Sequence, residues 1–480
     1  MGPDERLRME TRRHFFGRLG VSVGQIALAE MLGGGRLFAA ETGSSPMAPR
    51  APHFPPKVKN VIFLFMAGGP SQLDLFENKP KLNEYDSRPI PPSLTDGKRF
   101  AFMDQFGATP LTVLGTKREF KRYGQSGAWL SNLLPNISTV VDDLAFVHGI
   151  STENFNHGPA KFFLNTGSTR PGRPSLGSWV TYGIGSESQE LPGFVVLLSG
   201  SRGPRGGAGL WSSGFAPTSY QGVTFRSGGD PILDLSNPDG VTQRTQRQTI
   251  DAIRDLNLAA LAETGDPEIS TRISAYEMAY KMQTSGPELI DFSKESQATL
   301  DMYGAEPGKA TYANNCLLAR RLVERGVRFV QLYHTDWDHH DDIGPPLDQA
   351  CKETDGPTAA LIKDLKQRGL LDSTLVVWGG EFGRTPMGEK RPTAGGRIGR
   401  NHHIEAYTMF FAGGGVKRGA SLGGTDDFGY TATEHIHVHD IQATILHLLG
   451  LDHTKLTFKF QGRNFRLTDV AGNVLKPMLA

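Results

Sequence analysis

Cysteine is scarce in this chain. Its two cysteines, Cys316 and Cys351, form neither a CxxC pair nor another spacing typical of zinc ligands. A zinc site built on cysteine is therefore not expected. The two thiols either pair as one disulfide or remain unpaired and buried.

The chain also lacks an excess of charge of either sign. Its 51 basic and 50 acidic residues give a formal net charge of +1 at pH 7. Proteins that bind nucleic acid usually carry a marked basic excess, so we expect no nucleic-acid partner. There is no internal repeat of fixed period, which argues against a repeat array. The 58 glycines and 30 prolines instead predict many tight loops, as in loop-rich enzymes.

No apolar run is long enough to predict a stable membrane span. The run from Leu19 to Leu32 is short and contains Glu30. It follows Thr11-Arg-Arg-His-Phe-Phe16 and precedes a stretch of small residues that ends near Ala40, so residues 1–40 resemble a twin-arginine (Tat) export signal. The resemblance implies export through the Tat machinery to the periplasm or another extracytoplasmic space. Pro, Ser and Ala are frequent in residues 41–56, which predicts a flexible linker.

Apolar runs and helical patterns alternate through the rest of the chain. At 52.3 kDa it is large enough for one big α/β domain or two smaller ones. Alternation of this kind predicts a doubly wound, mostly parallel sheet flanked by helices, over residues 57–480, with a helical insertion at about 245–325. The predicted strands are 58–66, 144–147, 193–198, 327–333, 373–378 and 407–412, and the predicted helices outside the insertion are 132–141, 156–166, 357–368 and 438–449.

The most informative segment is Thr374 to Pro386, where a buried strand runs into a glycine-rich turn that presents Glu381 and Arg384. Ligands and catalytic groups of open α/β sheets lie at the carboxyl ends of strands. Two segments rich in histidine flank this turn along the chain. Together they predict a metal site built from strand-end loops, with candidate ligands Asp336, Asp338, His339, His340, Glu381, His402 and His403.

Five motifs give the chain a resemblance to a known superfamily. They are Gly68-Gly-Pro-Ser-Gln-Leu-Asp74, Asn156-His-Gly-Pro-Ala160, Trp337-Asp-His-His340, Gly380-Glu-Phe-Gly-Arg-Thr-Pro386 and Val438-His-Asp440. From Val58 to the end, the chain resembles the alkaline phosphatase and sulfatase superfamily and, more closely, the exported proteins grouped as DUF1501. The superfamily resemblance implies a hydrolase of phosphate or sulfate esters.

The resemblance implies one altered site. Where sulfatases read Asp-His-Gly or Asp-Asn-Gly, this chain has Glu381 followed by Phe382, so one ligand is kept and one is replaced by a hydrocarbon ring. Ala67 stands where the superfamily's first strand ends in an aspartate, and Asp74 could return only through a loop. His157 replaces the Ser, Thr or Cys nucleophile, and Lys161 replaces the usual arginine.

The resemblance implies that the neighbouring metal site is intact. Asp336 or Asp338 would bind with His339 or His340, and His402 or His403 would complete the site. A carboxylate with two imidazoles suits Zn²⁺ best, with Mn²⁺, Fe²⁺ or Ca²⁺ as alternatives. Three protein ligands leave room for a water whose pKa falls towards roughly 7.

The sequence thus favours an exported hydrolase that uses metal-activated water, with His157 or Glu381 as general base. Lys161 and Arg384 would hold the anionic ester, and a sulfated polysaccharide is one candidate substrate. A binding or scaffold protein with a degenerate site is the alternative, and isomerase or mutase chemistry is a third. The alternating His435, His437 and His439 are expected to cap the last helix and bond in the core.

Overall fold

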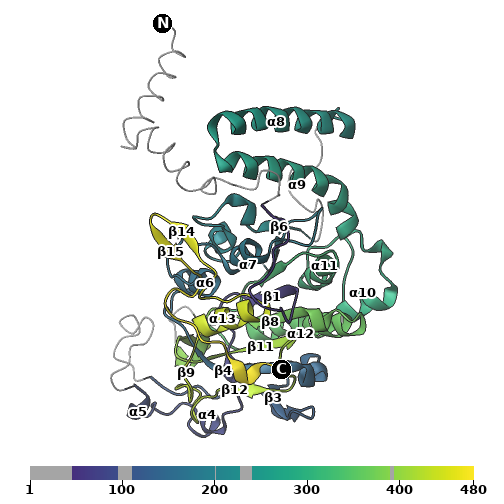
Figure 1. Ribbon diagram of the computed structural model, residues 1–480. Helices are drawn as coiled ribbons and strands as arrows, with labels where there is room; N and C mark the ends of the chain where they lie inside the picture. The colour runs from purple at the N-terminus through teal and green to yellow at the C-terminus, as the bar shows by residue number, and fades with distance from the viewer. Residues whose placement is uncertain (1–45, 96–110, 201, 227–239, 390–393) are drawn as a thin grey trace. The chain divides into compact units, whose positions relative to one another are not determined.

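The computed structural model describes residues 46–95, 111–200, 202–226, 240–389 and 394–480. Within these residues the central sheet has nine strands, in the order β12-β4-β11-β8-β1-β7-β5-β6, with β13 also paired to β4 (Figure 1). The strands are β1 (Asn60–Met66), β4 (Leu144–Ser151), β5 (Phe194–Ser199), β6 (Val223–Phe225), β7 (Phe329–His334), β8 (Thr374–Gly379), β11 (Tyr407–Gly413), β12 (Ser421–Leu422) and β13 (Ile436–His437).

The sheet is mostly parallel, as the sequence predicts. β1 pairs in parallel with β7 on one side and β8 on the other, and β5 continues the parallel set. Among the strands of this sheet that the structure describes, only β11 runs antiparallel to its neighbours, β8 and β4. All six of the predicted strands are present, and no end differs from its predicted position by more than four residues. The mixed α/β class is therefore confirmed.

Both faces of the sheet are buried, which explains why its strands are continuous apolar runs. Successive residues of β1 alternate between two hydrophobic clusters: Ile62 and Leu64 belong to one, and Val61 and Phe63 to the other. The first cluster includes residues of α11 (Tyr312–Glu324) and α12 (Pro345–Gln367), and the second includes residues of α6 (His157–Thr166), α7 (Leu176–Ile184) and α13 (Val438–Leu448).

Helices occupy most of residues 243–324, where the sequence has a helical period. α8 (Gln243–Thr264) and α9 (Pro267–Ile290) lie side by side (Figure 1). α10 (Gln297–Tyr303) and α11 follow, and α11 packs on β7 and β5. The predicted linker is described from residue 46, and its amides at Arg50 and His53 donate to Ile184 and Gly450, so this part lies against the domain.

Two predicted helices need correction. The sequence predicts an α-helix over residues 132–141, but the chain forms a 3-10 helix at Ile137–Asp143, and Asp355 accepts the amides of Asn136 and Ile137 at its start. α12 begins at Pro345, twelve residues before the predicted start. The pair Pro345-Pro346 suits a first helical turn, and Pro357 is accommodated inside the helix.

Cys316 and Cys351 are both buried and free. No helix in the described part of the chain is long and apolar enough to cross a membrane.

The remaining elements are α3 (Gln72–Leu75), α4 (Pro80–Glu84), α5 (Pro92–Thr95), β2 (Phe120–Tyr123), β3 (Ala128–Ser131), β9 (Gly383–Glu389), β10 (Gly399–His403), β14 (Phe458–Phe460), β15 (Arg463–Phe465) and 3-10 turns at Gly207–Trp211, Thr218–Tyr220, Phe292–Lys294, Leu371–Ser373 and Lys476–Met478.

Candidate metal centre

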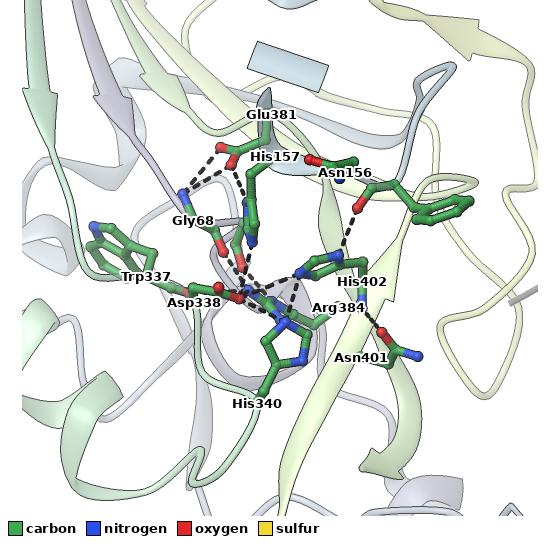
Figure 2. Close-up of polar contacts among 12 residues, drawn as sticks. Gly68, Asn156, His157, Trp337, Asp338, His340, Glu381, Arg384, Asn401 and His402 are labelled. Carbon is green, nitrogen blue, oxygen red and sulfur yellow. Dashed lines mark hydrogen bonds and ion pairs between the residues drawn. The ribbon is translucent and has the colours of Figure 1, made fainter. Parts of the chain in front are cut away.

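Three imidazoles converge on one carboxylate at the carboxyl end of the sheet (Figure 2). Oδ1 of Asp338 lies 2.8 Å from Nε2 of His340, 3.1 Å from Nε2 of His157 and 3.4 Å from Nε2 of His402. One ligand atom from each of these four residues lies within 4.8 Å of every other. We call these four residues the His/Asp group.

Separate elements position the members of the group. His157 is the first residue of α6, whose N-cap Asn156 accepts the amide of Gly158 and whose C-cap is Gly167 in the left-handed conformation. Asp338 and His340 lie in the loop after β7, and His402 lies on β10, which pairs with β9 in a hairpin. Residues distant in the sequence therefore meet only in the folded chain.

Each imidazole is oriented by a partner on its other ring nitrogen. Nδ1 of His157 lies 2.6 Å from Glu381, and Nδ1 of His340 lies 2.5 Å from Glu389. Nδ1 of His402 lies 2.6 Å from the carbonyl of Phe155, which can only accept, so this nitrogen donates. Acceptors on Nδ1 leave the lone pair of a neutral imidazole on Nε2, which is the arrangement of metal-ligating histidines.

The three Nε2 atoms that face Asp338 have too few hydrogen-bond donors to satisfy their lone pairs. Nε2 of His340 and Nε2 of His402 lie only 2.7 Å apart, so two lone pairs would face each other unless a proton or a cation lies between them. Nε2 of His157 is buried and has no partner with hydrogen-bond geometry. Burial, reinforced by Arg384, outweighs Asp338 and keeps the pKa of His402 well below its usual value, which disfavours the proton. A divalent cation fits this donor set.

Arg384 is used by the protein itself. The side chain is 0% exposed, and its Nε donates to the carbonyl of Gly69 at 2.9 Å. One terminal nitrogen donates to the carbonyl of Arg400 at 3.0 Å, and the other donates to Asp338 at 2.7 Å and to the carbonyl of Gly68. Arg384 thus ties strand-end loops together, and its nitrogens are already engaged.

Glu381 lies behind His157 and outside the His/Asp group. Its two oxygens each lie 3.1 Å from the amide of Gly68, and Oε1 lies 3.1 Å from Nζ of Lys161. Burial alone would raise its pKa, but Lys161 and the hydrogen bond with His157 lower the pKa to about 2. Glu381 is therefore an enclosed, ionised acceptor that orients His157, and Lys161 balances its charge.

The remaining candidate ligands are not members of the group. Asp336, which has a φ of 74°, pairs with Nε of Arg202 at 3.5 Å. Nε2 of His403 contacts the carbonyl of Tyr430 at 2.7 Å. His339 is buried, and burial together with Arg384 lowers its pKa to about 4.

Asp74 does not reach the group either. It accepts Nε of Arg400 at 2.7 Å and the hydroxyls of Ser71 and Thr116, so its oxygens belong to a buried ion pair. Burial would raise its pKa, but Arg400 and these hydroxyls lower it. Arg400 and Glu389 were not singled out in the sequence, because a charged residue on a strand carries no local signal of its partner. Two of the three alternating histidines behave as predicted: His437 caps α13, and His439 in its first turn bonds to Gln442.

The fold and the group define an α/β protein with histidine and aspartate side chains that could hold a metal ion at the carboxyl edge of its sheet. The chain belongs to the family described as "Protein of unknown function (DUF1501)", whose model matches residues 58–479. No curated protein matches the sequence.

Several solved structures are similar to the chain at low identity. Alkaline phosphatase from the Antarctic bacterium TAB5 is 10% identical, with 82% of this chain and 99% of that chain covered and a TM-score of 0.36. The lipoteichoic acid synthase LtaP from Listeria monocytogenes is 8% identical, with 88% and 78% covered and a TM-score of 0.36. The PsFucS1 sulfatase from Pseudoalteromonas sp. is 14% identical, with 82% and 68% covered and a TM-score of 0.35.

Proposed function

We propose that this protein is an exported, metal-dependent hydrolase of sulfate or phosphate esters that uses water as the nucleophile. The convergence of three Nε2 atoms on Asp338, each imidazole being fixed through its Nδ1, is the observation that carries the proposal. Such preorganisation is typical of a ligand set, because an unoccupied group of this kind would bury lone pairs without donors.

His157, Asp338, His340 and His402 would hold the metal. Nitrogen donors favour Zn²⁺, with Mn²⁺ and Fe²⁺ next, and disfavour Ca²⁺, which prefers oxygen. When bound, a divalent metal supplies Lewis acidity and activates water near neutral pH. The expected cofactor is therefore a single zinc ion.

The charges around the group support an anionic substrate only when a cation is present. Asp338 pairs with Arg384 and Glu381 pairs with Lys161, whereas Glu389 contacts His340, so these five side chains carry an excess of one negative charge if the imidazoles are neutral. A bound dication reverses that sign. Low local dielectric makes such a change of sign more effective than it would be in bulk water.

The protein's residues have distinct roles in this proposal. His157 is directed into the group by Glu381, so it serves as a ligand, and the nucleophile role implied by the superfamily is replaced by water. Glu381 is 0% exposed and saturated with donors, so it positions His157 and does not move the proton of the water. Arg384 fixes Asp338 against the loops of Gly68 and Gly69.

Metal analysis of matched variants tests the proposal. His402 faces Asp338, whereas its neighbour His403 faces the carbonyl of Tyr430. Protein purified without an affinity tag should hold about one transition metal per chain, and His402→Ala and Asp338→Ala should lose it. His403→Ala is the control and should keep it. Metal that survives in His402→Ala, or a native protein without metal, would contradict the assigned ligands.

Activity on 4-nitrophenyl phosphate and 4-nitrophenyl sulfate then tests hydrolysis. The wild type should release nitrophenol, a chelator should abolish the reaction, and zinc should restore it. One observation favours a second candidate function, a metal-containing binding protein. The buried ring of Phe382 replaces a metal ligand of the superfamily, and it packs against His157 and His402 at centroid distances of 4.8 and 4.5 Å. Metal without hydrolysis, together with binding of a sulfated glycan, would select that alternative.

A further inference from the structure

A cleft beside the His/Asp group is lined by a basic loop whose function the site does not yet explain. The loop follows β5 at the carboxyl edge of the sheet and contributes Arg202, Gly203, Pro204 and Arg205 to the lining. His157, Lys161 and Asp338 line the same cleft. We infer that Arg202 and Arg205 recognise the tetrahedral anionic group of the substrate, in the role that the sequence suggests for Arg384 and Lys161. This inference rests on the proposed function and names its substrate-binding residues.

Arg384 and Lys161, the two basic residues that the sequence suggests for this role, already bind other groups of the protein. Arg384 donates to the carbonyls of Gly68, Gly69 and Arg400 and to Asp338, and Lys161 pairs with the buried Glu381. Both side chains are almost completely buried. Withdrawing either from these partners would leave buried acceptors without donors, which costs about 1–3 kcal/mol per group. A substrate anion therefore needs other donors.

Arg205 is free to supply them. Its side chain is exposed, and it makes no ion pair or hydrogen bond with any residue that the structure describes. Arg202 is 59% exposed and is steered by Asp336, which lies 3.5 Å from its Nε. A guanidinium presents paired donors that match two oxygens of a sulfate or phosphate group, and it stays charged at every working pH.

The loop itself is anchored, so that these side chains lie at the cleft. The hydroxyl of Thr335, at the end of β7, donates to the carbonyl of Arg202 at 2.9 Å. Gly200 has a φ of 100°, and a Cβ there would lie 2.3 Å from the same hydroxyl, so the backbone packs closely against Thr335. The amide of Gly207 closes the other end on the carbonyl of Pro204 at 3.0 Å. Anchoring reduces the entropy lost when an anion binds.

This arrangement selects esters whose terminal sulfate or phosphate group enters the cleft. The anion would lie between the two arginines and the His/Asp group, so the arginines bind it before and during reaction. Loss of such a contact weakens ground-state and transition-state binding alike, which raises KM and leaves kcat nearly unchanged. Added salt should weaken the contact, because both arginines are open to solvent.

Calorimetric titration of inorganic phosphate and of inorganic sulfate into the metal-loaded full chain tests the inference. Arg205→Ala and Arg202→Ala should each weaken the Kd by about tenfold, as expected when a charged hydrogen bond is lost. Arg205→Lys should recover part of the affinity. The control is Arg170→Ala, an exposed arginine that does not line the cleft. Metal content should be equal in all of these variants.

The outcomes separate this inference from the proposed function. Unchanged anion affinity and KM in both arginine variants would overturn the role of the loop and leave the metal-dependent hydrolase intact. A second outcome is a native protein that binds the anion without holding a metal or hydrolysing an ester. If Arg205→Ala then loses that binding, the anion site is retained and the hydrolase is overturned. A metal-loaded native protein that binds neither anion would overturn the inference.

Discussion

Nδ1 of His340 lies 2.5 Å from Oε2 of Glu389, so a carboxylate that is buried on β9 fixes an imidazole of the loop after β7. The negative charge of Glu389 makes the imidazole of His340 a stronger ligand for a metal. Glu389→Gln should keep the hydrogen bond but remove this charge. We expect metal affinity to fall by about 10–100-fold. Competition with a chelator of known affinity measures this.

Glu434→Gln is the matched control for Glu389→Gln, because Glu434 is exposed. It should leave metal affinity unchanged. Equal affinity in the Glu389 variant and the wild type would show that His340 is not held for a metal.

Gly68 allows the loops of the site to approach each other. Its φ is 131°, and a Cβ there would lie 2.7 Å from the amide nitrogen of Asp338. Gly68→Ala should therefore displace Asp338 and reduce both metal occupancy and ester hydrolysis. Gly369→Ala tests backbone strain alone, since Gly369 has a φ of 69° and nothing near its Cβ position. That control should cost about 1 kcal/mol of stability and keep the metal. Full metal content in Gly68→Ala would contradict the tight approach.

The Asp74–Arg400 ion pair should make stability depend on pH. Burial would raise the pKa of Asp74, but Arg400 and two hydroxyls lower it, so the folded carboxyl binds its proton less readily than the unfolded one. Its contribution to stability is thus present above the unfolded pKa of about 3.9 and is lost as pH falls through the lowered folded pKa. Asp74→Asn should cost about 3–5 kcal/mol at neutral pH, because it leaves Arg400 buried without its counter-charge.

Denaturant unfolding at several pH values checks this prediction. The gap between the wild type and Asp74→Asn should narrow as pH falls below about 4. Asp427→Asn serves as control, since Asp427 is exposed in its pair with Lys81 and should change stability little. A gap that is independent of pH would show that the carboxyl pKa is not lowered by folding.

If the protein is exported through the Tat machinery, as we propose, export should depend on Arg12 and Arg13, which lie outside the described residues. Replacing both with lysine keeps the positive charge, so a loss of export would show that arginine itself is required. We expect the precursor to remain in the cytoplasm, while Arg8→Lys is exported as the wild type is. Fractionation of a bacterial host with and without a Tat system measures this. Export of the double variant, or export without the Tat system, would contradict the signal.

The chain's strand-end motifs contain all four residues that the folded chain brings together as the His/Asp group, and the function of that group stays a prediction. The apolar run of β1 and the segment from Thr374 to Gly380 both identify buried strands whose ends carry polar residues. Neighbouring candidates such as His402 and His403 could not be told apart in the sequence. On the strand β10 they point to different surroundings, one towards Asp338 and the other towards Tyr430.

Roles that depend on distant partners were beyond the sequence. Arg384 was expected to bind an anion, but three backbone carbonyls and Asp338 surround it in the folded chain. His157 was expected to act as a base or to replace the nucleophile, and its Nε2 instead faces the carboxylate of Asp338. Whether it holds a metal there stays a prediction for the variants above.

The sequence by itself determined the mixed α/β class, because continuous apolar runs that alternate with helical patterns satisfy their backbone and bury both faces only in such a sheet. It also determined which residues are available as ligands. The tertiary structure decided which of them meet, because each contact joins segments that are distant in the sequence. His157 and Glu381 are 224 residues apart, and His340 and Glu389 are 49 residues apart. Side-chain direction, burial and hydrogen-bond partners are set by that packing, and they separate a ligand from a structural ion pair.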